Sequence, residues 1–127
     1  MSDSPDQTAR PVPATVQGLH VYPVKGEPGR DLTDVLVEAE GLEGDRRKKA
    51  PVQVVAAQDV RDDTRANLVV TLTSEALARS VGAVLRVGDV ELDVTGPAGG
   101  CPGVYAAVRR PGTVRLGDPV ATETDPD

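Results

Sequence analysis

The chain contains no Phe and no Trp, and this absence constrains its fold more than any other feature. Its 127 residues suffice for one domain with a substantial core, but that core must consist of aliphatic side chains. Valine is the commonest of these, and β-branched side chains fit pleated strands better than helices. The 13 Gly and 11 Pro residues supply turns between short elements. The composition therefore predicts a mainly β domain of short strands.

Eight segments are predicted as strands, because they are rich in β-forming residues and are bounded by turn residues. They are residues 16–22, 34–38, 52–57, 68–72, 84–87, 90–95, 103–108 and 113–120. Only Gly88-Asp89 separates the fifth from the sixth, which predicts an antiparallel hairpin because glycine adopts the positive φ of a tight turn. Eight short strands favour a closed or nearly closed β-barrel, since closure removes exposed edges. Packing of flat sheets is the alternative.

One short helix is predicted over residues 74–82. Thr73 precedes it as the N-cap, Glu75 lies in its first turn and Gly82 ends it. A second turn of helix is predicted within residues 56–65. Residues 1–15 and 121–127 are polar and are predicted to be disordered tails, so the ordered domain is expected over residues 16–120.

Charge and composition argue against several classes of function. A net charge of −6 disfavours nucleic acid as a partner, because phosphate binding needs a basic face. No apolar run approaches the roughly 20 residues of a membrane span, and the start of the sequence has no apolar signal segment, so the cytoplasm is the expected location. One Cys and one His exclude an internal disulfide and disfavour a zinc site. The histidine, His20, is interpreted as a structural side chain rather than a catalytic base.

The single cysteine, Cys101, lies in the glycine-rich stretch GPAGGCPGV. A structural cysteine is usually buried on a regular element, whereas flanking glycines let backbone or ligand approach the sulfur closely. Cys101 is therefore a candidate catalytic thiol, provided that nearby cations stabilise its thiolate. The alternative is a buried cysteine without chemistry.

Three further segments carry candidate anion-binding residues. Lys25 follows a strand in YPVKGEPGR, and Arg46 begins a run of four cations in EGLEGDRRKKA. Arg65 and Asn67 in TRANL lie on the same face if that segment is extended. The structural alternatives are a solvated charged loop for the cations and an ordinary strand entrance for Asn67.

Taken in order, the segments YPVKG, GLEGDRR, TRANLVV, VGAVLRVGDVELDVTGPAGGC and VRLGDPV resemble the MOSC domain, the molybdenum-cofactor sulfurase C-terminal domain, in a short standalone form. The resemblance spans residues 16–120 and implies a MOSC-like β-barrel with one or two short helices. It implies that Cys101 carries sulfur as a persulfide, or ligates molybdenum if the cofactor is bound. It also implies that Lys25, Arg46, Arg65 and Asn67 contact a pterin cofactor or another anion.

Three functions are compatible with this resemblance. The first is a sulfur carrier or sulfurtransferase, independent of pyridoxal phosphate, that receives sulfur on Cys101 from a cysteine desulfurase or another donor. The second is an oxidoreductase module that binds the molybdenum cofactor, although the 18 residues between Arg46 and Arg65 leave short loops for a large cofactor. The third is a non-catalytic domain that keeps the barrel and binds a small-molecule or anionic ligand.

Overall fold

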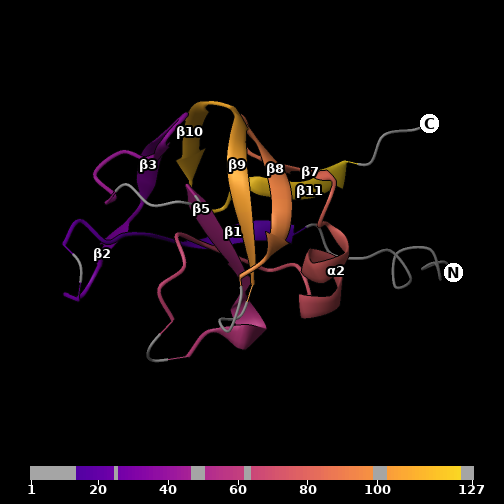
Figure 1. Cartoon of the computed structure of the whole chain (residues 1–127), viewed down its shortest axis with the longest axis horizontal. Coiled ribbons are helices and arrows are strands. Elements are labelled where there is room, and N and C mark those ends of the chain that lie inside the picture. Colours follow the sequence, from indigo (N-terminus) through magenta and orange to yellow (C-terminus); the bar gives the residue numbers. More distant parts are fainter. Residues whose placement is uncertain (1–13, 25, 47–50, 62–63, 99–102, 124–127) are drawn as a thin grey trace, which may run out of the picture.

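The computed structural model describes residues 14–24, 26–46, 51–61, 64–98 and 103–123 (Figure 1). The strands are β1 (Ala14–Val21), β2 (Arg30–Leu32), β3 (Asp34–Glu38), β4 (Gly41–Leu42), β5 (Val52–Ala56), β6 (Leu68–Val70), β7 (Val84–Val87), β8 (Val90–Pro97), β9 (Val104–Arg110), β10 (Gly112–Arg115) and β11 (Pro119–Glu123). The helical elements are the 3₁₀ turn η1 (Ala57–Asp59) and the helix α2 (Ser74–Arg79). The predicted mainly β fold class is confirmed.

Seven strands close into a barrel in the order β11-β7-β8-β9-β5-β6-β1, and β1 pairs back with β11. Neighbouring strands are antiparallel except β5 and β6, which run parallel. β2 extends the sheet by pairing with the second half of β1. Because the ring is closed, its strands have no long unpaired edge. The predicted barrel is confirmed.

The barrel interior is an aliphatic core. A separate three-stranded sheet, β10-β3-β4, packs against the barrel, since its inward side chains Val37, Leu42 and Val114 belong to the same buried cluster. Leu77 of α2 joins this cluster from outside the sheet. The fully buried leucines are Leu19, Leu42, Leu68, Leu77, Leu85 and Leu92. Each such side chain contributes about 1.5–3 kcal/mol by leaving water, which compensates for the absence of large aromatic groups.

The predicted hairpin and helix are both present. Val87 pairs with Val90 and Leu85 with Leu92, and Gly88 has a φ of +56°. In α2 the Thr73 hydroxyl accepts a hydrogen bond of 3.0 Å from the Ala76 amide. No helix in the described parts of the chain is long and apolar enough to cross a membrane. The helical turn expected within residues 56–65 is η1.

The prediction of a single strand over residues 113–120 is wrong. The segment divides into β10 and β11, which belong to different sheets, and a tight turn with Gly117 at a φ of +87° separates them. Short strands β2 and β4 were not predicted either. Strand β1 begins at Ala14, before the predicted strand start at residue 16, and β11 ends at Glu123, after the predicted strand end at residue 120.

Replacing Gly88 with Ala is expected to destabilise the protein by more than about 2 kcal/mol. Left-handed backbone costs a non-glycine residue roughly 1–2 kcal/mol, and a Cβ here would also collide with the Asp118 carboxylate, which accepts a hydrogen bond from the Arg115 amide. Gly117→Ala is the matched control, because its φ is +87° but its surroundings are open. Equilibrium urea unfolding measures both. An equal loss of unfolding free energy in the two variants would contradict the collision with Asp118.

Candidate functional site

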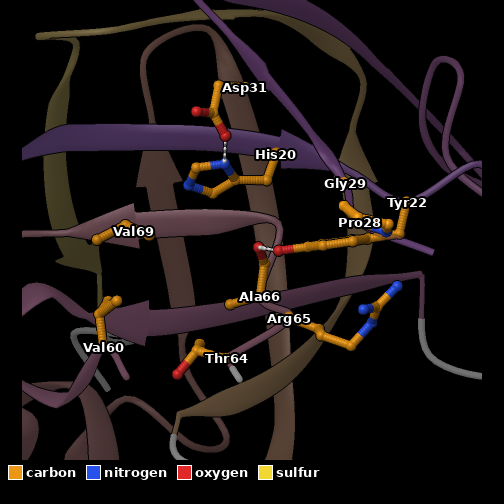
Figure 2. Close-up of a pocket in the computed structure, with 10 residues that line it drawn as sticks. All are labelled: His20, Tyr22, Pro28, Gly29, Asp31, Val60, Thr64, Arg65, Ala66 and Val69. Atoms are coloured by element: carbon orange, nitrogen blue, oxygen red, sulfur yellow. Dashed lines mark hydrogen bonds and ion pairs between the residues drawn. The ribbon is translucent and has the colours of Figure 1, made fainter. Parts of the chain in front are cut away.

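A pocket of about 290 Å³ lies on the outer face of the barrel and forms the candidate site (Figure 2). Leu19 and Val21 of β1 point into the core, so His20 and Tyr22, which alternate with them, face outward. The opposite walls come from the segment before β2 and from the segment between η1 and β6. The lining residues are His20, Tyr22, Pro28, Gly29, Asp31, Val60, Thr64, Arg65, Ala66 and Val69.

The floor of the pocket is apolar. Val55, Ala66 and Val69 form a small buried cluster that is distinct from the barrel core, with Ala57 packed against it. Val60 lies at the pocket as well but remains 46% exposed. The pocket therefore has a buried aliphatic floor and, at Val60, an aliphatic side chain that is exposed to solvent.

His20 and Asp31 form a polar pair at one side of the pocket. They are directly paired residues of β1 and β2, and the Nδ1 of His20 lies 2.8 Å from Oδ1 of Asp31. A carboxylate accepts a hydrogen bond from Nδ1–H, so the neutral imidazole keeps Nε2 as an acceptor. The absence of a side chain at Gly18 leaves room for Nε2, since a Cβ there would lie 2.9 Å from it.

Tyr22 and Arg65 form a second polar pair. The guanidinium carbon of Arg65 lies 4.6 Å from the centroid of the Tyr22 ring, a cation–π contact. The Nη2 of Arg65 donates to the Glu27 carbonyl at 2.6 Å, and the Tyr22 hydroxyl donates to the Ala66 carbonyl at 3.1 Å. Burial raises the pKa of Tyr22, while the charge of Arg65 opposes this rise. The phenol is therefore neutral at physiological pH.

The side chains of Asn67 and Asp45 connect the segments that form the pocket through hydrogen bonds. The Asn67 amide nitrogen donates to the His20 carbonyl at 3.2 Å and to Oδ2 of Asp45 at 3.1 Å. The side-chain oxygen of Asn67 accepts a hydrogen bond from the backbone amide of Gln53 at 3.0 Å. Oδ1 of Asp45 accepts one from the backbone amide of Tyr22 at 2.8 Å. Both side chains are buried. This network fixes the backbone that carries His20 and Tyr22.

The predicted site residues have different surroundings. Arg65 is exposed and lines the pocket, whereas Asn67 is fully buried and does not. A shared face was expected only if the segment is extended, and the strand begins only at Leu68. Arg46 is exposed outside the pocket lining, and its amide donates to the Tyr22 carbonyl at 3.3 Å. The binding roles of all three stay predictions.

Lys25 and Cys101 lie outside the described residues. The described residues on either side of the cysteine do have defined positions. The Ala98 amide donates to the Gly103 carbonyl at 3.1 Å, and Gly103, at a φ of +95°, lies directly against the Val54 carbonyl. Val55, the next residue of β5, belongs to the cluster beneath the pocket. Among the described residues, no three His, Cys, Asp or Glu side chains group into a metal site.

Three residues of this region were not predicted as site residues: Tyr22, Asp31 and Asp45. The sequence could have indicated Tyr22 and Asp45, because they lie in the same motifs as Lys25 and Arg46, which were selected for their charge. Asp45 directly precedes Arg46, but its partners are remote in sequence and only the fold shows that it is buried. Asp31 becomes recognisable only when β2 pairs with β1.

No known family model and no curated protein sequence matches the chain. Solved structures do share its fold. YuaD of Bacillus subtilis is 17% identical with a TM-score of 0.70, over 86% of this chain and 94% of YuaD. YiiM of Escherichia coli is 17% identical with a TM-score of 0.65, over 91% and 71% of the two chains. YiiM of Geobacillus stearothermophilus is 14% identical with a TM-score of 0.64, over 87% and 75%. YuaD and YiiM are MOSC-domain proteins, so the fold agrees with the one that the motifs implied.

Replacing Asn67 with Ala is expected to cost at least about 2 kcal/mol of unfolding free energy. The substitution removes three hydrogen bonds and leaves Asp45 and the Gln53 amide without this partner, and each buried unsatisfied group costs about 1–3 kcal/mol. Thr95→Ala is the control, since its hydroxyl donates one exposed hydrogen bond. Urea unfolding that shows equal losses in both variants would contradict the importance of the network.

The pKa of Tyr22 is expected to lie above 10.0 and to rise further in Arg65→Gln, because burial raises it and Arg65 lowers it. Asp31→Asn should reduce it. A raised folded-state pKa stabilises the protein below pH 10, and this contribution is lost as the pH rises through the folded-state pKa. The chain has two tyrosines, so titration of tyrosinate absorbance in a Tyr105→Phe background reports Tyr22 alone. A lower pKa in Arg65→Gln would refute the assigned contact.

Proposed function

We propose that this chain is a small MOSC-like domain that carries sulfur on Cys101. The observation that carries the proposal is the fold shared with YuaD and YiiM over most of the chain. It is supported by the order of the sequence motifs, which puts the only thiol of the chain in the position of the cysteine of the MOSC domain that it resembles.

The proposed step is a transfer between persulfides. The Cys101 thiolate attacks the outer sulfur of a donor persulfide, such as that of a cysteine desulfurase, and the sulfur–sulfur bond of the donor breaks. Cys101 gains the outer sulfur as a persulfide, and the donor leaves as a thiolate. One sulfur atom changes carrier and no external oxidant or reductant is consumed.

The sequence around this thiol supports access of a donor, because Gly99, Gly100 and Gly103 flank it in sequence without side chains.

The described pocket does not fit the molybdenum cofactor. Its volume of about 290 Å³ is at the lower limit of ligand pockets, which measure roughly 300–1,000 Å³. Among its ten described lining residues, Arg65 is the one lysine or arginine, and Asp31 adds a carboxylate. A pterin phosphate needs more positive charge than these described residues offer. The sulfur-carrier proposal therefore has no step through this cofactor.

The proposal predicts that the protein gains the mass of one sulfur atom after incubation with a cysteine desulfurase and cysteine. A thiol reductant should remove the added mass, because it reduces a persulfide. Cys101→Ser should gain nothing, and it is a clean control because the chain has a single cysteine. Intact-protein mass spectrometry measures the gain. An unchanged mass in the native protein, or the same gain in Cys101→Ser, would refute the proposal.

A further inference from the structure

We propose that the pocket between β1, β2 and the segment before β6 binds a small organic monocarboxylate. In this proposal Arg65 holds the carboxylate, and the Nε2 of His20 accepts a hydrogen bond from a donor group of the same ligand. Binding here does not depend on sulfur transfer at Cys101, since both Arg65 and His20 line the described pocket.

The imidazole of His20 is held in one orientation. Its Nδ1 is engaged by Asp31 at 2.8 Å, and the imidazole is 27% exposed while the carboxylate is 90% exposed. The proton is therefore held on the side of Asp31, and the acceptor lone pair belongs to Nε2. Because Gly18 has no Cβ, it avoids a contact of 2.9 Å with this nitrogen. An oriented imidazole with a free acceptor can take a proton or a hydrogen bond from a ligand.

The guanidinium of Arg65 is also held in position. Stacking on Tyr22 and donation to the Glu27 carbonyl hold the guanidinium, although the residue is exposed. Among the described residues, that carbonyl is its one hydrogen-bond partner, so further N–H groups remain for a ligand. A guanidinium held in place loses little entropy when a planar carboxylate binds to it.

The described lining also bears on the charge and size of the ligand. Among these residues Arg65 contributes one positive charge and Asp31 one negative charge, which favours a monoanion over a doubly charged phosphate. The buried Val69 and Ala66, together with the half-exposed Val60, provide an apolar surface for the body of the ligand. About 290 Å³ accommodates a small molecule rather than a nucleotide. Benzoate has these properties and is the probe of choice.

Proton NMR of the imidazole tests binding directly, because His20 is the only histidine. Titration with benzoate should move the His20 signals to saturation, whereas neutral benzamide should not. Arg65→Gln should weaken binding by at least about tenfold, the loss expected when a charge-assisted contact is removed. Arg115→Gln, an exposed arginine on β10, should bind as the native protein does. Absence of saturation, equal binding by Arg65→Gln, an equal loss in Arg115→Gln, or equal binding of inorganic phosphate would overturn the proposal.

The role of His20 has a separate readout. Nitrogen-15 NMR of the imidazole should show the tautomer with the proton on Nδ1 near neutral pH, and Asp31→Asn should reduce this preference. Among the three hydroxybenzoate isomers, at least one should bind more tightly than benzoate, and His20→Phe should abolish that gain. A proton on Nε2 in the native protein, or no gain with any isomer, would refute the acceptor role.

Discussion

The buried hydrogen bonds of Asn67 are the interaction on which the site depends. One amide side chain satisfies the His20 carbonyl, the Asp45 carboxylate and the Gln53 amide, which belong to three segments far apart in sequence. Asp45 extends the network to the Tyr22 amide. In the low-dielectric interior such bonds are strong and their loss is costly. A side-chain hydrogen bond from Asn67 to Asp45 thus joins the motifs TRANL and GLEGD, and the Asp45 carboxylate joins them to the backbone of YPV.

The aliphatic barrel explains why the pocket lies outside it. Val and Leu side chains fill the interior of the seven closed strands. The described pocket lies instead on the outer face, where His20 of β1 and Tyr22, directly after β1, line it. The parallel pairing of β5 and β6 requires a crossover connection, and that connection forms one wall of the pocket. The topology of the barrel thus determines where a ligand can bind.

Features that depend on neighbouring residues in the sequence were predicted correctly. The Gly88-Asp89 hairpin and the helix capped by Thr73 depend on neighbouring residues alone, and both are present. The division of residues 113–120 into two strands depends on which partners β10 and β11 find, so alternation in sequence could not show it. The burial of Asn67 likewise depends on partners more than ten residues away. The sequence could identify it as a polar residue at a strand entrance but could not identify its partners.

The pairing of Arg65 with Tyr22 indicates how a chain of net charge −6 can still attract an anion. Long-range repulsion from surface carboxylates is screened within about 10 Å at ordinary salt, so the local arrangement decides. Tyr22 is kept neutral by its raised pKa and therefore adds no negative charge beside the guanidinium. Its ring instead offers Arg65 a face of partial negative charge, which orients the cation without neutralising it. The positive charge of Arg65 consequently remains available to a ligand in the pocket.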